Sequence, residues 1–151
     1  MDLRRISRSE ILAALGGVLL AVSLFLPWYA TSSNPNANVS GMKGDITAWD
    51  AHNILRYLFL AVALAPIVLL WVIVRDHQLS WPRGEMTAVV SVFAFGLIAY
   101  QAFVSKPGDP SSLVHLKWGI FVALLGTVLM FVGSALRSSD VERARKPPGT
   151  I

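Results

Sequence analysis

Four long apolar blocks, separated by polar segments, set the pattern of this chain. The blocks cover about residues 11–27, 54–74, 86–104 and 113–136, and charged side chains are nearly absent inside them. A run of about 18 or more apolar residues is long enough to cross a bilayer as a helix. The pattern therefore predicts an all-α fold, in which residues 1–136 form a single domain, a bundle of four transmembrane helices.

The first apolar block has some features of a secretory signal peptide, but its end does not fit one. Pro27, Trp28 and Tyr29 occupy the place where a small-x-small cleavage site would be needed. We therefore expect an uncleaved first transmembrane helix.

The polar segments between the blocks differ in length and character. The longest runs from Leu26 to Asn53, so the bundle should have a long first outer loop. Within it, residues 31–44 are rich in Ser, Asn and Gly, which favours a mobile or weakly hairpin-like loop. We expect Pro27 to end the first helix and residues 48–53 to start the second. Residues 137–151 form a basic tail, expected to be disordered beyond a helical turn or two.

The positive charges are distributed unevenly between the two sides of the predicted bundle. Nine lie on the side of the termini and four on the other side. The nine are Arg4, Arg5, Arg8, Arg75, Arg83, Arg137, Arg143, Arg145 and Lys146, and the four are Lys43, Arg56, Lys106 and Lys117. Loops rich in Lys and Arg remain cytoplasmic, so we expect both termini in the cytoplasm. The net charge of +4 then reflects membrane topology and not nucleic-acid binding.

Aromatic residues support the same frame, because Trp and Tyr prefer the membrane–water interface. Those predicted at the outer boundary are Trp28, Tyr29, Trp49, Tyr57, Tyr100 and Trp118, and those at the inner boundary are Trp71 and Trp81.

Small residues recur at helical spacing on two of the predicted spans. The fourth span carries Gly119, Ala123, Gly126 and Gly133, with Met130 completing the series, and the first span carries Ala13, Gly17 and Ala21. Small residues let helix backbones approach closely, which is the main source of packing contact in lipid. We expect these two faces to meet inside the bundle. The alternative is that one of them mediates self-association.

The candidate chemistry lies at the outer rim of the bundle and not within the spans. No Asp, Glu, Lys or His lies between the ends of the spans, and Arg56, about one turn inside the second span, can extend to the headgroups. The candidate partner or ligand rim consists of Trp28, Tyr29, Trp49, Asp50, His52, Arg56, His115 and Lys117.

Two interpretations of this rim compete. A metal could be bound by His52, His115 and an Asp, since imidazole and carboxylate suit zinc or copper. The preferred interpretation is structural: Asp50 or Asn53 caps the second helix and the other side chains contact lipid headgroups.

The chain contains no Cys, which excludes thiolate metal sites and redox motifs. No pairing of a nucleophile with a base and no phosphate-binding glycine loop stands out. We therefore expect a protein without enzymatic activity, cofactor or metal.

Two short motifs resemble a known group of proteins. A first helix ending in Phe25–Tyr29 (FLPWY), followed by a polar segment and then Ala48–Ala51 (AWDA), resembles small and largely uncharacterised four-span membrane proteins of actinobacteria. The resemblance implies a bacterial plasma-membrane location and no particular activity.

Two functional hypotheses follow from these features. The first is an accessory or scaffold subunit that packs with another membrane protein, or with itself, through the small-residue faces and the outer loop. The alternative is a small transporter, channel or lipid-binding protein in which Arg56, Gln101 and His115 line an outward vestibule.

Overall fold

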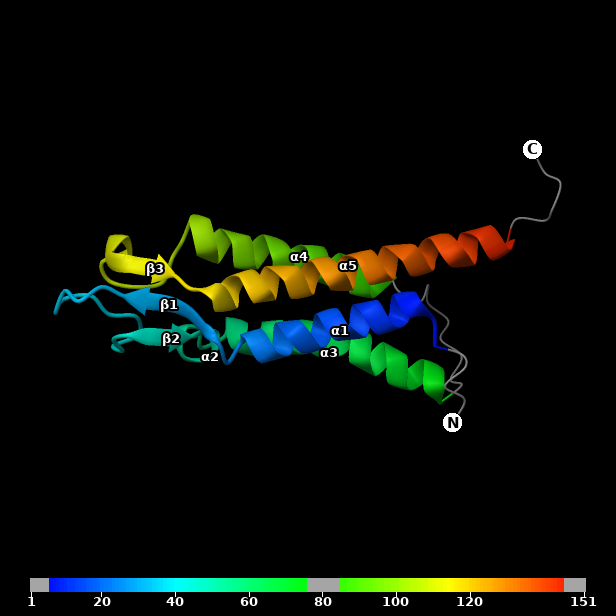
Figure 1. Cartoon of the computed structure of the whole chain (residues 1–151), viewed down its shortest axis with the longest axis horizontal. Helices are drawn as coiled ribbons and strands as arrows, with labels where there is room; N and C mark the ends of the chain where they lie inside the picture. The colour runs from blue at the N-terminus through cyan, green and yellow to red at the C-terminus, as the bar shows by residue number, and fades with distance from the viewer. Residues whose placement is uncertain (1–5, 76–84, 146–151) are drawn as a thin grey trace.

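The computed structural model describes residues 6–75 and 85–145, and it consists mostly of helices joined to a few very short strands (Figure 1). In chain order the elements are α1 (Arg8–Ser23), β1 (Pro27–Thr31), β2 (Asp45–Thr47), α2 (Ala48–Ala51), α3 (Leu55–Val74), α4 (Glu85–Phe103), a 3-10 turn (Ser111–Leu113), β3 (Val114–Leu116) and α5 (Trp118–Arg145). Several residues used above for topology lie outside the described ranges, namely Arg4, Arg5, Trp81, Arg83 and Lys146.

Helices α1, α3, α4 and α5 lie side by side along the long axis of the molecule (Figure 1). α1 packs along α5, while α3 packs mainly on α1 and α4 mainly on α5. Among the described residues, three segments are long and apolar enough to cross a membrane: α3, α4 and residues 118–137 of α5. α1 is shorter, with 16 residues. These features are those of a helical membrane protein.

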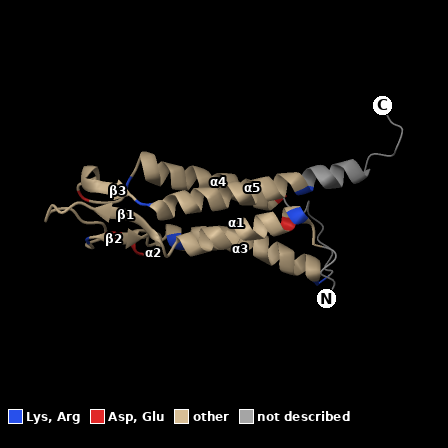
Figure 2. Cartoon of the chain, in the orientation of Figure 1, with Lys and Arg blue, Asp and Glu red and all other residues tan. Residues whose placement is uncertain are grey.

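The surface of the bundle is apolar along its sides and charged at its ends. Val68, Val89 and Leu125 are more than half exposed on three different helices, whereas Leu20 and Met130 are fully buried between them. In Figure 2 the acidic and basic residues lie toward the two ends of the helices and in the segments beyond them, and the middle of the helices is free of them. Apolar flanks with charged ends are the arrangement that a bilayer favours.

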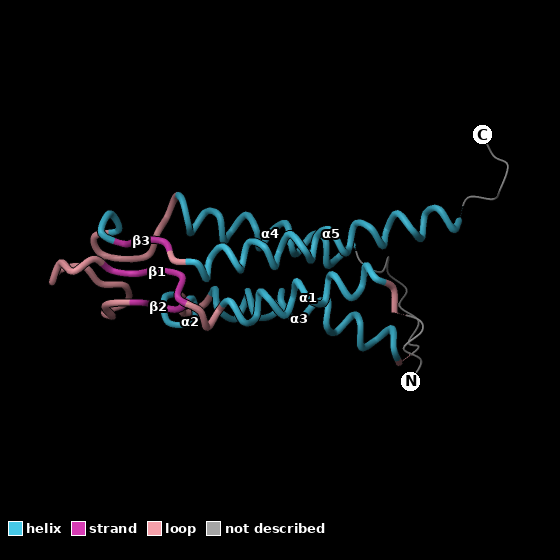
Figure 3. Tube along the Cα trace, viewed as in Figure 1, coloured by secondary structure: helices cyan, strands magenta, loops and turns pink. Residues whose placement is uncertain are grey.

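A three-stranded antiparallel sheet caps one end of the bundle, with β1 between β2 and β3 (Figure 3). Tyr29 of β1 lies opposite Ile46 of β2 and Leu116 of β3. The pairing continues into α5, because the Lys117 backbone N–H donates to the Trp28 carbonyl over 2.8 Å. We call this sheet, together with the loop between β1 and β2, the sheet head.

The sheet corrects the prediction of a purely α-helical fold. Residues 113–117 were expected to begin the fourth span, but 114–116 form β3 and α5 begins at Trp118. An apolar run by itself does not separate a short strand from the start of a helix. The pairing of β1 with β3 joins segments that lie far apart in the sequence, so no local pattern reveals it.

The loop between β1 and β2 is held by specific contacts. Val39 and Met42 exchange two backbone hydrogen bonds of 2.9 Å around Ser40 and Gly41, whose φ angles of +52° and +80° suit a type I′ turn. Asn38 pairs with Asp109 in the connector before β3. The loop thus contains a hairpin turn, which is one of the two forms expected, and it is paired with a distant connector.

The helix ends around the sheet head also differ from the predicted ones. α1 ends at Ser23 and not at Pro27, and residues 24–26 form tighter turns with i→i−3 hydrogen bonds. Residues 48–53 do not start a continuous second helix, because α2 stops at His52, where the backbone becomes extended before α3. At the other end, α5 continues as helix through Arg145, slightly more than the helical turn or two expected at the start of the tail, and residues 146–151 lie outside the described ranges.

Candidate functional site

The sheet head is joined to the bundle through two adjacent aromatic residues of β1. In a regular strand, neighbouring side chains point to opposite faces, but the register of β1 shifts between Pro27 and Tyr29. As a result, Trp28 and Tyr29 are both fully buried. The bulge therefore turns two consecutive rings into the molecule.

Trp28 fills the space between the helix ends. Its indole Nε1–H donates to the Ser23 carbonyl over 2.7 Å, and its ring lies 5.8 Å from that of Phe59. Gly119 makes room for it, since a Cβ there would lie 2.9 Å from Trp28 Cδ1. The same carbonyl also accepts from the Leu26 backbone N–H over 3.0 Å, so the indole adds a second hydrogen bond at the end of α1.

Tyr29 and His52 form a buried polar pair beside Trp28. Tyr29 Oη lies 3.3 Å from His52 Nε2, and the His52 ring meets both aromatic rings edge-on at about 6 Å. Burial lowers the pKa of His52 to about 4 and raises the pKa of Tyr29 above its usual value. Desolvation penalises the charged form of each group, so both side chains are neutral at pH 7.

A second aromatic group surrounds Arg56 at the start of α3. The guanidinium donates from Nη1 to the Trp49 carbonyl over 3.1 Å and from Nη2 to the Tyr57 hydroxyl over 3.2 Å. Its Cζ lies 5.1 Å from the Trp49 ring centre and 4.9 Å from that of Tyr57. Phe25, in the turns that follow α1, stacks on Trp49 with ring centres 5.3 Å apart. We call Phe25, Trp49, Arg56 and Tyr57 the arginine cluster.

The remaining rim residues take structural positions. The predicted cap of the second span by Asp50 or Asn53 is not formed, because the N-cap of α3 is Ile54, which makes no side-chain cap hydrogen bond. Thr47 caps the short α2 instead: its hydroxyl accepts from the Asp50 backbone N–H and donates to the Asp50 carboxylate over 2.7 Å. Lys117 forms an exposed ion pair with Asp45 at 3.3 Å, which contributes little to stability.

The structure does not bring the two predicted histidine ligands together. His52 is buried beneath β1, whereas His115 is exposed on β3 opposite Ala30. Among the described side chains of residues 6–75 and 85–137, no group of three or more His, Asp or Glu is placed to hold a metal ion. The three residues of the alternative vestibule, Arg56, Gln101 and His115, lie on α3, α4 and β3, and the vestibule stays a prediction.

The small residues of α5 lie directly against α1. A Cβ on Gly126 would lie 2.8 Å from the Gly16 carbonyl oxygen, and one on Gly133 would lie 2.6 Å from the Ala13 nitrogen. The face of α1 that meets α5 thus includes Ala13 and Gly16. Ala123, on the same face of α5, is fully buried.

Gly17 faces a different neighbour from the predicted one. A Cβ on Gly17 would lie 2.4 Å from the Ala63 carbonyl oxygen and 2.7 Å from Pro66, both on α3. Ala21, one turn further along, is only partly buried. Of the predicted i, i+4 series, Ala13 thus meets α5 and Gly17 meets α3. The residue that continues the face toward α5 is Gly16, which points about 100° away from Gly17.

A buried ion pair joins the other ends of α1 and α5, and the sequence analysis did not predict it. The Arg137 guanidinium contacts the Glu10 carboxylate, and both side chains are largely buried. Glu10 also accepts from the Ser7 backbone N–H over 3.0 Å in a capping box at the start of α1. The Ser-x-x-Glu spacing was a visible signal for the cap, but the partner on α5 was not.

No protein-family model matches this chain, and neither a curated protein nor a solved structure matches it. The resemblance to four-span actinobacterial proteins therefore stays a prediction, resting on the residues around Pro27 and Trp49.

Proposed function

We propose that the chain is a four-span protein of the bacterial plasma membrane. In this proposal α1 crosses the membrane together with the three helices that are long and apolar enough to do so, α3, α4 and α5. Its 16 residues rise about 24 Å, and the apolar turns of residues 24–26 extend the segment toward the roughly 30 Å of the hydrocarbon core. Its close packing along α5 also supports a shared membrane frame. The excess of Lys and Arg near the termini supports cytoplasmic N- and C-termini, with the sheet head outside.

Within this frame, we propose a non-enzymatic accessory or scaffold subunit that binds another membrane protein through the sheet head. The observation that carries the proposal is the construction of this head. Segments from three parts of the chain are hydrogen-bonded into one platform, and neutral Trp28, Tyr29 and His52 side chains fill its interior. A preorganised platform loses little conformational entropy on binding a partner.

The small-residue faces support placing the partner at the head. Gly16, Gly126 and Gly133 already contact backbone of the facing helix, and Gly17 contacts α3. Because these positions are occupied within the chain, they offer little surface for a second protein. Side chains of the loop between β1 and β2, such as Met42, are instead exposed and accessible to a partner.

Site-specific photocrosslinking in native membranes tests this proposal. A photoreactive amino acid at Asn36 or Met42, both exposed in the head, should give an adduct of discrete mass with one partner. The same group at Val68, exposed on the side of α3, serves as the control and should label lipid only. Monomer alone at both head positions, or the same protein adduct from Val68, would contradict a partner at the head.

A further inference from the structure

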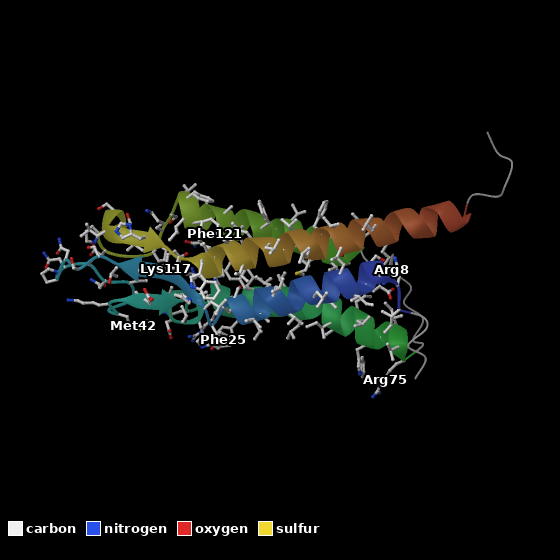
Figure 4. The ribbon with its side chains drawn as sticks, viewed as in Figure 1. Arg8, Phe25, Met42, Arg75, Lys117 and Phe121 are labelled. Atoms are coloured by element: carbon white, nitrogen blue, oxygen red, sulfur yellow. The ribbon has the colours of Figure 1, made fainter. Side chains whose placement is uncertain are left out.

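The arginine cluster lies where the helices meet the sheet head, and Figure 4 shows Phe25 at this junction. Beyond it, α3 continues as an uncharged apolar helix through Val74, and before it lie the polar Asp45 and Asp50. The cluster thus marks the boundary between apolar flank and polar head. In a membrane this boundary lies at the level of the lipid phosphates.

The charge of Arg56 is not matched by an acidic side chain of the described protein. No carboxylate among the described side chains of residues 6–75 and 85–137 forms an ion pair with it, and its partners there are the neutral Trp49 carbonyl, the Tyr57 hydroxyl and two rings. A cation in such a partly buried place favours an external anion.

The hydrogen-bond geometry of Arg56 leaves donors for that anion. A guanidinium has five N–H groups. One on Nη1 and one on Nη2 are used internally, and Nε is buried without a partner. One N–H therefore remains on each terminal nitrogen of the planar guanidinium fork, and both are available to phosphate oxygens. The contacts with Trp49 and Tyr57 hold this fork in place.

The neighbours of the cation are apolar and exposed. Phe25 is 60% exposed, Tyr57 is 57% exposed and Ile54, the residue before α3, is 82% exposed. A ligand that fits this surface carries an anionic group directly beside hydrocarbon. A soluble anion would leave these side chains uncovered, whereas a phospholipid supplies both parts.

From this geometry we propose that the arginine cluster binds the phosphate of one phospholipid in the leaflet on the side of the sheet head. Phe25, Ile54 and Tyr57 contact its glycerol and upper acyl chains. The site prefers a lipid with net negative charge, because a zwitterionic headgroup brings its own cation and competes with Arg56. This lipid site is separate from the partner surface proposed above, and either can fail without the other.

Native mass spectrometry of the full chain tests the lipid site. Protein is reconstituted in vesicles of phosphatidylcholine alone or mixed with phosphatidylglycerol, and the lipid retained after mild delipidation is measured. The wild type should retain one phosphatidylglycerol, and Arg56→Gln should weaken retention about tenfold or more, since charge-assisted hydrogen bonds are lost. Arg56→Lys keeps the charge without the planar fork and should retain the lipid more weakly than wild type.

Lys117→Gln is the matched control, because it removes one positive charge from the same end of the molecule but lies outside the cluster. It should retain lipid as the wild type does. Equal loss in Lys117→Gln and Arg56→Gln would mean only diffuse electrostatic attraction, and equal retention of the two lipids would contradict charge preference. Either result overturns the proposal.

Two further measurements keep the outcome unambiguous. Circular dichroism establishes whether Arg56→Gln is folded, and if it is not, undiminished retention by folded Arg56→Lys overturns the proposal. Inorganic phosphate added to delipidated protein in detergent should leave its melting temperature unchanged. A rise that Arg56→Lys abolishes would instead assign a site for free phosphate.

Discussion

His52 shows how a single side chain depends on its surroundings. From the sequence it was a rim residue at a helix start and a possible metal ligand, but the bulge in β1 places it under Trp28 and Tyr29. There its imidazole is 7% exposed and hydrogen-bonded to Tyr29, and burial lowers its pKa to about 4. The residue thus holds the head together in its neutral form.

Acidification should therefore destabilise the sheet head through His52. Its pKa is 6.5 without burial and about 4 when folded, so in this interval the unfolded chain binds the extra proton. The free energy of unfolding should fall as the pH drops from about 6.5 to about 4, by an amount of the order of 3 kcal/mol, and this contribution should level off below. Melting temperatures of the detergent-solubilised protein across this range measure the effect.

His52→Gln should flatten this part of the pH profile, because glutamine can accept from Tyr29 but does not titrate. His115→Gln provides the control, since His115 is exposed on β3 and its loss should leave the profile of the wild type. If the pH profile of His52→Gln equals that of the wild type, protonation of His52 is not the cause of the destabilisation in acid.

At the scale of elements, the close approach of α1 and α5 organises the bundle. Backbone atoms of one helix lie where a Cβ of the other would be, at Gly16, Gly126 and Gly133. Lipid does not drive apolar helices together, so such contact and the buried Glu10–Arg137 pair are the main attractions between these two helices. The position of a glycine in the sequence therefore does not by itself show which helix it faces; the folded structure shows it.

Gly16→Ala should destabilise the protein, whereas Gly96→Ala should not. The new Cβ at Gly16 would lie 2.5 Å from the Gly126 carbonyl oxygen and 2.6 Å from the Met130 nitrogen, which are backbone atoms that cannot rotate away. We expect a loss of about 1–3 kcal/mol, read from thermal or denaturant unfolding in detergent.

Gly96 is the matched position, because a Cβ there meets nothing within 4 Å. Alanine at Gly96 should be neutral or stabilising by up to about 1 kcal/mol, since it favours the helix. Equal stability of the two alanine variants would show that α1 and α5 are not packed this closely.

At the scale of the whole molecule, the sheet head lies at one end of the four helices, and the start of α1 and the end of α5 lie at the other (Figure 1). Wherever the bundle spans a membrane, the head must then face one compartment, and the start of α1 and the end of α5 must face the other. This relation comes from the arrangement of the helices, whereas the choice of compartment comes from the Lys and Arg distribution.

Single-cysteine labelling tests the topology without background, because the chain has no cysteine. Ser33→Cys, exposed in the head, should react with a membrane-impermeant maleimide in intact cells. Arg75→Cys, exposed at the other end of α3, should react only after permeabilisation. The reverse pattern would invert the orientation, and labelling of both sites in intact cells would contradict an intact span between them.

The sequence by itself determined the apolar segments, their helical character and the approximate limits of α3 and α4, because these depend on local composition and length. It also located residues near the junction of the bundle and the sheet head, such as Trp28, Trp49 and Arg56. Only the tertiary structure decided that residues 114–116 are a strand, that Gly16 and not Gly17 meets α5, and that Glu10 contacts Arg137. Each of these joins segments far apart along the chain, and hydrogen bonding and close packing between such segments depend on the folded backbone and not on the local pattern.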